Sequence, residues 1–351
     1  MNNFKNYSLA ILAISFFLFS CEKDEAPVEP LGQYESGVFI INEGAFGQSN
    51  ASMTHYDPNA KTVTNQIFFK KNNSSSLGDV FQSYFIHDTL GFNIINNSNT
   101  VEIVNANTFK SLGVVDVSLP RYMTTNNTKA YLSEWVSFSD PGRVSVINLN
   151  DLELETTITV GYGAENLLVV DNMLYVSNNF QSDISIIDLE SNQVVKTLEV
   201  GSAPGGLLLD ANNDLWVACG GGSDENWAPL NNGSLVKIST ATNTVTTTVA
   251  LGANIPTKIS INSSKDAILY LVANEVFKLA ISEDTKPAKA FITTDIAGTI
   301  YGIGVNPSTD VIYLADSKGF AENGQVYRYN ADGSVLDNFE VSVGPNGFVF
   351  K

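Results

Sequence analysis

Few side chains in this sequence belong to the types that perform catalysis. It has two histidines, His55 and His87, and their positions do not match the ligand spacing of a metal site. No Gly-x-Ser-x-Gly motif is present, so the sequence lacks the sharp turn that presents a nucleophilic serine. Cys219, in the apolar stretch LWVACGGG, has the surroundings of a small buried side chain rather than those of a nucleophile. These features predict a protein that is not an enzyme and that uses no metal and no cofactor.

Two short motifs imitate ligand-binding loops. Residues 161–166 (GYGAEN) contain two glycines but lack the third glycine and the following helix of a nucleotide-binding loop. Residues 210–215 (DANNDL) begin like a calcium loop but lack its glycine and its distal glutamate, so we interpret them as a hairpin turn. A metal-dependent hydrolase or lactonase stays open as an alternative, with Glu165 and Asn166 as its nearest candidate residues.

The charge of the chain argues against one class of partner. Its 37 acidic and 19 basic residues give a formal net charge of −18 at pH 7. Nucleic-acid binding depends on clustered lysine and arginine side chains that neutralise phosphates. We therefore expect no nucleic-acid partner.

The first twenty residues have the order of charge and hydrophobicity found in an export signal. An apolar run from Leu9 to Phe19 follows a single charge at Lys5. This run is shorter than the roughly 20 residues that a membrane-spanning helix needs. The pattern predicts a signal peptide at residues 1–20.

A cysteine directly follows that segment. The string LFSC (18–21) resembles a bacterial lipobox, and CEKDE (21–25) resembles the surface-export signal of Bacteroidota lipoproteins. These resemblances imply that Cys21 is lipidated and that a lipid anchor holds the protein on the outer face of the outer membrane. We interpret the acidic, proline-containing residues 21–33 as a tether. The alternative is an ordinary signal peptide with an incidental cysteine.

The elements that would position a site repeat along the rest of the chain. Short apolar runs with period-two alternation are separated by turns rich in Asp, Asn and Ser, which is typical of β-strands. One aromatic residue recurs early in the second strand of each unit, at intervals of roughly 40 to 55 residues, the size of a propeller blade. These residues are Phe39, Phe92, Tyr131, Tyr175, Trp216, Tyr270 and Tyr313. We predict an all-β, seven-bladed β-propeller of four-stranded antiparallel blades over residues 34–351.

The two ends of the repeat region predict how the ring closes. The first unit begins with residues 38–41, which match a second strand, so its innermost strand is missing. Residues 347–350 form an additional apolar run, which follows the last complete unit and has no partner strand within it. If this run supplies the missing strand of blade one, the ring closes without an open sheet edge.

The links between blades and the loops between second and third strands share one rim of such a propeller, and we expect the ligand there. Large exposed rings on loops indicate a binding face. The alternative for any single ring is that it folds down and caps its blade. The candidate ligand-binding residues are Phe46, Arg121, Tyr122, Trp135, Phe138, Glu165, Asn166, Asn179, Phe180, Trp227, Lys258, Tyr301 and Phe320.

Several stretches resemble one family of propellers. They are NEGAFGQSNASMTHYD, LGDVFQSY, NNSNTVEIVNANTF, LPRYM, LWVACGGG, YGIGVNP and GQVYRYNADGSVLDNF. The chain is similar in these stretches to the YncE-like seven-bladed surface lipoproteins of Bacteroidota, a BtuG-like or DUF5074-type family. That family includes cobalamin-capturing proteins that cap a TonB-dependent transporter.

The resemblance implies a function. We expect a cell-surface lipoprotein that captures a corrinoid and passes it to a TonB-dependent outer-membrane transporter. An aromatic funnel suits a large, flat macrocycle whose rim carries amides. The alternative from another class is an interaction scaffold whose rim binds a protein and no small ligand.

Overall fold

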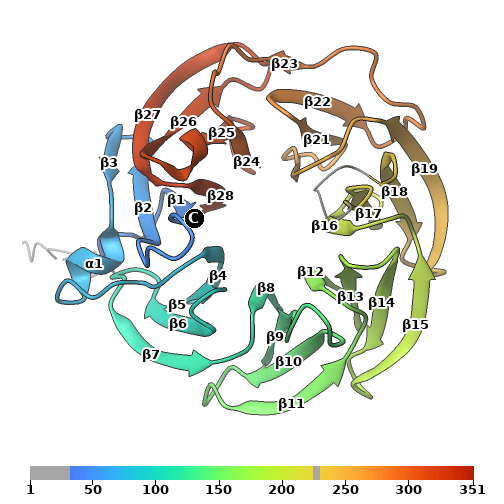
Figure 1. Ribbon diagram of the computed structural model, residues 1–351, viewed down its shortest axis with the longest axis horizontal. Helices are drawn as coiled ribbons and strands as arrows, with labels where there is room; N and C mark the ends of the chain where they lie inside the picture. Colours follow the sequence, from blue (N-terminus) through green and yellow to red (C-terminus); the bar gives the residue numbers. More distant parts are fainter. Residues whose placement is uncertain (1–31, 224–229) are drawn as a thin grey trace, which may run out of the picture. The chain divides into compact units, whose positions relative to one another are not determined.

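The computed structural model describes residues 32–223 and 230–351. These residues form seven four-stranded antiparallel sheets, which are the blades of a propeller around a central axis (Figure 1). The structure therefore confirms the prediction of an all-β, seven-bladed propeller. No helix in the described part of the chain is long and apolar enough to cross a membrane. The predicted signal peptide, Cys21 and Trp227 lie outside the described residues, as does most of the predicted tether.

The two inner strands of each blade lie closest to the axis. The innermost strands of blades 2 to 7 and then of blade 1 are β4 (Phe81–His87), β8 (Pro120–Thr125), β12 (Ala164–Val170), β16 (Pro204–Leu209), β20 (Ile259–Ile261), β24 (Ile300–Val305) and β28 (Pro345–Phe350). The second strands, in the same order, are β5 (Leu90–Ile95), β9 (Lys129–Glu134), β13 (Met173–Asn178), β17 (Asp214–Cys219), β21 (Ala267–Val272), β25 (Ile312–Asp316) and β1 (Val38–Asn42).

The two outer strands complete each blade. The third strands of blades 1 to 7 are β2 (Ser52–Asp57), β6 (Thr100–Asn105), β10 (Arg143–Asn148), β14 (Asp183–Asp188), β18 (Gly233–Ser239), β22 (Glu275–Ala280) and β26 (Asn323–Tyr329). The outermost strands are β3 (Thr62–Thr64), β7 (Ser111–Asp116), β11 (Leu154–Thr159), β15 (Gln193–Glu199), β19 (Thr244–Gly252), β23 (Ile292–Thr293) and β27 (Val335–Val343). Two short helices, α1 (Ile67–Lys71) and η1 (Lys318–Phe320), lie in the connections.

Burial explains why the second strands are so apolar. Each is covered on both faces by neighbouring blades, whereas outermost strands such as β7 are exposed along most of their length. The recurrent aromatic residue of the second strand is at most 1% exposed in all seven blades, as the sequence pattern predicts. Burial of each such ring contributes about 1.5–3 kcal/mol to folding, so the column is the core of the repeat.

The predicted closure of the ring is also present. β28 pairs antiparallel with β1, with Phe350 opposite Val38 and Phe348 opposite Ile40. The last strand thus completes blade 1 as its innermost strand, beside the first strand of the described chain (Figure 1). Each innermost strand contacts the innermost strands of both neighbouring blades, so closure leaves a continuous wall around the axis.

One face of the propeller carries all the connections that matter for the site. Because strands alternate in direction, the links between blades and the loops between second and third strands emerge on the same face. Blade 2 shows this directly, since Val117 N and Leu119 N of the outgoing link donate to Asn99 of the loop, at 2.9 Å each. We call this side the loop face.

Candidate ligand-binding site on the loop face

The innermost strands begin with an irregularity at the loop face. In β8, Pro120 pairs with Glu134 and Met123 pairs with Leu132, so two residues oppose one on β9. A register shift of one residue also occurs at the start of β12, β16, β4, β24 and β28. A β-bulge of this kind turns side chains away from the normal alternation of a strand. The bulged residues form the top of the wall around the axis.

These starts align as seven four-residue segments. They are Phe81–Tyr84, Pro120–Met123, Ala164–Leu167, Pro204–Leu207, Pro256–Ile259, Ile300–Ile303 and Pro345–Phe348. The fourth residue of each is apolar and enters the strand, and the second and third residues supply most of the lining of a central cavity of about 390 Å³. The site is therefore built from corresponding positions of different blades.

Hydrogen bonds between neighbouring blades fix the cavity wall. Ser83 Oγ donates to the carbonyl of Arg121 at 2.6 Å, and Ser177 Oγ donates to the carbonyl of Gly205 at 2.8 Å. The amide of Asn346, in β28, donates to the carbonyl of Phe81, in β4, at 3.0 Å. We call the region where β28 pairs with β1 and meets blade 2 the closing seam. Because the bulged backbone is held by its neighbours, the cavity is largely formed before any ligand arrives.

Arg121 and Glu165 form an ion pair at the edge of the cavity. The guanidinium donates from Nε and Nη2 to the two carboxylate oxygens at 2.7 and 2.8 Å, and both side chains are 12% exposed. Trp135 Nε1 donates to the same carboxylate at 2.9 Å, and the guanidinium lies over the Trp135 ring at 3.9 Å. Burial lowers the pKa of Arg121, but the Glu165 carboxylate and smaller contributions from nearby groups raise it by more, so the net shift of the pKa is upward. The two charges compensate each other within this pair.

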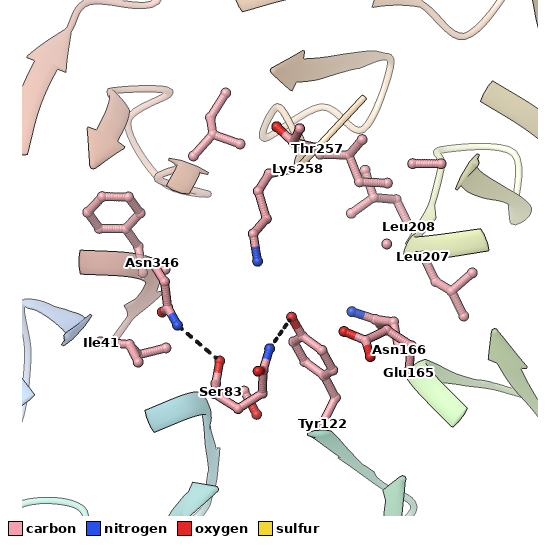
Figure 2. Close-up of a pocket in the computed structure, with 18 of the residues that line it drawn as sticks. Ile41, Ser83, Tyr122, Glu165, Asn166, Leu207, Leu208, Thr257, Lys258 and Asn346 are labelled. Carbon is pink, nitrogen blue, oxygen red and sulfur yellow. Dashed lines mark hydrogen bonds between the residues drawn. The ribbon is translucent and has the colours of Figure 1, made fainter. Parts of the chain in front are cut away.

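Lys258 is the cation that faces the cavity itself. Its ammonium group reaches towards the axis among Tyr122, Asn166 and Asn346 (Figure 2). Tyr122 raises the pKa of Lys258 against the lowering effect of burial, with smaller contributions from nearby groups, and the net shift is upward. Lys258 is thus cationic at neutral pH. The ring centroid of Tyr301 lies 5.7 Å from Lys258 Nζ.

Polar groups surround this cation. Gln82 Nε2 donates to the Tyr122 hydroxyl oxygen at 3.0 Å, which leaves the hydroxyl hydrogen available for a ligand. The backbone N–H of Asn166 donates to Ser177 at 3.0 Å, and the Asn166 side-chain amide faces the cavity (Figure 2). Burial and, to a smaller extent, Glu43 raise the pKa of Tyr301 to about 12, so its hydroxyl is neutral. The wall therefore offers hydroxyl and amide groups around one positive charge.

Two further cavities adjoin the central one. A cavity of about 720 Å³ between blades 4, 5 and 6 shares Asn179, Gly205 and Thr257 with it. A cavity of about 670 Å³ beside blades 6 and 7 shares Thr257 and Lys258 with it, and Tyr301 lines its far side. The three adjoin on the loop face, where Thr257 lines all of them and Lys258 lines the first and the third.

The aromatic residues of the loops form separate groups. Trp135 contacts Phe138 and Phe180, with ring centroids 5.7 and 4.8 Å apart, over blades 3 and 4. Phe138 is 75% exposed, whereas Phe180 lies over Gly163, where a Cβ would meet its ring at 2.7 Å. Gly163 has a φ of 71°, so glycine suits this position for both reasons.

The remaining loop rings lie elsewhere. Phe320 packs edge-on against Tyr301 at 5.2 Å, beside blade 7. Phe46 is 78% exposed on the loop that follows β1. Among the residues that the structure describes, the predicted rings thus share the loop face but form separate groups rather than one continuous funnel.

The structure brings together five of the predicted residues on the central cavity: Tyr122, Glu165, Asn166, Asn179 and Lys258. Gln82, Ser83, Thr257 and Asn346 also line it and were not among the predicted residues. Their signal in the sequence is the alignment of the seven segments. The stretch PNG at 345–347 matches the position of IYG at 300–302, although the sequence pattern was interpreted only as a closing strand.

The histidines and acids do not gather into a metal centre in the described residues. No group of three or more His, Cys, Asp or Glu side chains there is placed to hold a metal ion. His55 is 7% exposed, and its Nε2 lies 2.8 Å from the carbonyl oxygen of Ser36. His87 Nε2 lies 3.7 Å from the Asp88 carboxylate at the other end of blade 2.

Fold and site together define a seven-bladed β-propeller with a polar cavity at its centre. Residues 36–350 match the family described as Domain of unknown function (DUF5074), and the chain belongs to that family. A search of curated proteins gives no match to the chain.

Solved structures show similar propellers. A quinonprotein alcohol dehydrogenase-like protein of Bacteroides thetaiotaomicron is 15% identical, with a TM-score of 0.68 over 90% of this chain and 78% of that one. A functionally unknown protein of Desulfotomaculum acetoxidans is 11% identical, with a TM-score of 0.67 over 90% and 98%. Hydrazine synthase of Kuenenia stuttgartiensis is 14% identical, with a TM-score of 0.56 over 74% and 85%. At these identities the likeness shows the fold alone.

Proposed function

We propose that this protein is a non-enzymatic binding protein of the cell surface, which captures a corrinoid and passes it to a TonB-dependent transporter in the outer membrane. The observation that carries the proposal is the depression formed by the three adjoining cavities, all of which Thr257 lines. The resemblance of the chain to YncE-like and BtuG-like lipoproteins of Bacteroidota supports the choice of ligand.

The chemistry of the depression suits such a ligand. A corrinoid is a large, flat macrocycle with amide side chains around its edge. Tyr122, Asn166 and Thr257 offer hydroxyl and amide groups for those amides, and Leu207 and Leu208 offer apolar surface to the ring. Such a mixture of apolar area and few polar contacts is typical of pockets for small ligands.

The proposal also assigns a role to the exposed rings. Phe138 is 75% exposed and Tyr162 is 40% exposed, both on the loop face over blades 3 and 4. Exposed aromatic side chains that lie together on loops are typical of protein interfaces. In this proposal they contact the transporter, while a lipid on Cys21 holds the protein at the membrane.

Calorimetry of the purified full-length protein with cyanocobalamin tests the capture role. We expect saturable binding at micromolar concentrations or below, together with a change in the visible spectrum of the corrinoid. Asn166→Ala removes a cavity amide and should weaken binding about tenfold. Asn212→Ala, in the turn between β16 and β17 on the opposite face, is the matched control and should bind as the wild type does. Absence of heat and of a spectral change would overturn the corrinoid assignment.

A scaffold without a small ligand is the second candidate, and the exposed rings over blades 3 and 4 favour it. Capture of partner proteins from native outer membranes distinguishes the two functions. A scaffold predicts that Phe138→Ala abolishes capture of a transporter while no corrinoid binds. A corrinoid-binding protein predicts that cyanocobalamin binds to Phe138→Ala with unchanged affinity.

A further inference from the structure

We infer that the centre of the propeller is a subsite for one anionic group, a phosphate or a carboxylate, held by Lys258. In the captured corrinoid this group would be the phosphodiester of the nucleotide arm, and this assignment rests on the proposed function. The subsite itself is argued from the geometry of the cavity and does not depend on the identity of the ligand.

The first observation is that the Lys258 ammonium makes no hydrogen bond to a described residue, whereas several other partly buried lysines do. Lys196 Nζ donates to the carbonyl of Asn243 at 2.7 Å, and Lys237 Nζ donates to the carbonyl of Ile281 at 2.6 Å. Within residues 32–223 and 230–351, no hydrogen-bond acceptor and no carboxylate contacts Lys258 Nζ, which faces the cavity (Figure 2). A half-buried ammonium without an acceptor is the group that an incoming anion would satisfy.

The second observation concerns the two carboxylates near the cavity, since either of them would otherwise compensate the charge. Glu165 is already bound by both arms of Arg121 and by Trp135 Nε1. Glu43 accepts a hydrogen bond from the Asn346 amide at 3.1 Å. Each carboxylate therefore has donors of its own, and Lys258 is left for a ligand.

The third observation is the set of neutral donors beside Lys258. The Tyr122 hydroxyl and the Asn166 amide lie on one side of the ammonium group, and Asn346, which binds Glu43, lies on another (Figure 2). An anion between Lys258, Tyr122 and Asn166 would receive charged and neutral hydrogen bonds, while the neighbouring Glu165 carboxylate is held by Arg121. Such charge-assisted bonds are roughly twice as strong as neutral ones, and lysine binds phosphate as a point charge.

The overall charge of the protein makes this arrangement informative. The chain carries a formal net charge of −18, so its surface repels anions in general. An anion that reaches the axis meets the Lys258 cation in a partly buried setting, where the attraction is less screened than at the surface. Anion binding should therefore be confined to this point rather than spread over the propeller.

Melting of the full-length protein with inorganic phosphate in place of chloride, at constant ionic strength, tests the subsite. We expect phosphate to raise the melting temperature of the wild type by about 2 °C or more at saturation. Lys258→Met and Lys258→Gln should lose this rise, whereas Lys110→Met, in a turn of the opposite face, should keep it. An equal rise in the Lys258 variants, or no rise in the wild type, would overturn the inference.

A second experiment separates this inference from the proposed function. Dicyanocobinamide has the corrin ring and its amides but lacks the phosphodiester of cyanocobalamin. We expect the wild type to bind cyanocobalamin about ten- to a hundredfold more tightly than dicyanocobinamide, and Lys258→Met to remove most of that preference. If neither corrinoid binds while the phosphate response depends on Lys258, the corrinoid function is wrong and the anion subsite stands. If both bind equally and the phosphate response is absent, capture stands and the subsite is wrong.

Discussion

Two lysines in this propeller occupy opposite ends of the innermost wall and differ in what surrounds their ammonium groups. Lys351, beside the closing seam, donates to the carbonyl oxygens of Tyr34 and Ala106 at 3.0 Å each, and also to the Asn107 side chain. Lys258, at the loop face, contacts no acceptor among the described residues. One ammonium group is saturated by the protein, and the other is directed into a cavity.

This difference separates the roles of the two ends. Around the seam, polar groups bind each other and connect blades 1 and 2, so they stabilise the ring. At the loop face, Tyr122 and, more weakly, Glu165 and Glu43 favour the charged form of Lys258, but its ammonium group makes no hydrogen bond to a described residue, so its donors are left for other partners. Such a group is expected where binding, rather than folding, determines the residue.

Deletion of residues 345–351 is the strongest way to break the seam. It removes β28, including Phe348 and Phe350, whose rings pack against Tyr313 at 5.5 and 5.3 Å. Both rings are partly buried, so each contributes less than the about 1.5–3 kcal/mol of a fully buried side chain, and the loss also exposes the edge of β1. We expect the melting temperature of the truncated protein, followed by circular dichroism, to fall by more than about 10 °C. An unchanged melt would show that β28 does not stabilise the ring.

Lys351→Met tests the closing seam with a smaller change, because it removes one ammonium group and keeps β28. The variant leaves the carbonyl oxygens of Tyr34 and Ala106 without their donor, and unsatisfied buried acceptors cost about 1–3 kcal/mol. We expect the free energy of unfolding in urea to fall by that amount. Lys110→Met is the control for loss of a lysine charge and should change it by less than about 0.5 kcal/mol. If the two variants had the same free energy of unfolding, Lys351 would not contribute to closure of the ring.

The pH dependence of stability should also originate at the seam. Burial lowers the pKa of His55, Lys351 lowers it further, and the Ser36 carbonyl and Asp57 oppose them. Because the folded pKa lies below the unfolded value of about 6.5, the unfolded state binds the proton first as pH falls. Stability contributed by neutral His55 is thus present above pH 6.5 and is lost as pH falls from there through the folded pKa.

His55→Gln should flatten this slope between pH 7 and pH 5.5, and Lys351→Met should reduce it. Unfolding in urea at several pH values gives the measurement, with His87→Gln as the matched control that keeps the slope. A slope that survives in His55→Gln would place the titrating group elsewhere.

The sequence predicted the seam better than the cavity, for a physical reason. The aromatic column and the closing strand follow from local period-two patterns, because a strand buried on both faces must be apolar wherever it occurs. The cavity depends on bulges, which are set by pairing with the neighbouring strand. Gln82 and Asn346 face the axis only because the register shifts at their positions, and neither residue type is unusual in a strand or a turn.

Contacts between distant blades explain the rest of the difference. Arg121 and Lys258 were equal candidates from the sequence, since both follow a proline in a link between blades. In the structure Glu165 forms an ion pair with Arg121, which is 44 residues earlier, whereas no described carboxylate forms an ion pair with Lys258. Which of the two cations is available for a ligand is decided by the side chains that neighbouring blades present to it, and the residues next to Arg121 and Lys258 in the sequence give no sign of those contacts.

Lys258→Met has the smallest expected effect on stability, and it tests most directly whether Lys258 differs from Lys351 in its contribution to folding. The substitution breaks no hydrogen bond or ion pair with the described residues and removes a partly desolvated charge, while the Tyr301 ring lies 5.7 Å away and contributes little. We expect the free energy of unfolding in urea to stay within about 0.5 kcal/mol of the wild type, without phosphate or ligand. If Lys258→Met destabilised the protein as much as Lys351→Met, Lys258 would be a structural residue. The two ends of the wall would then not differ in the way that the binding proposal requires.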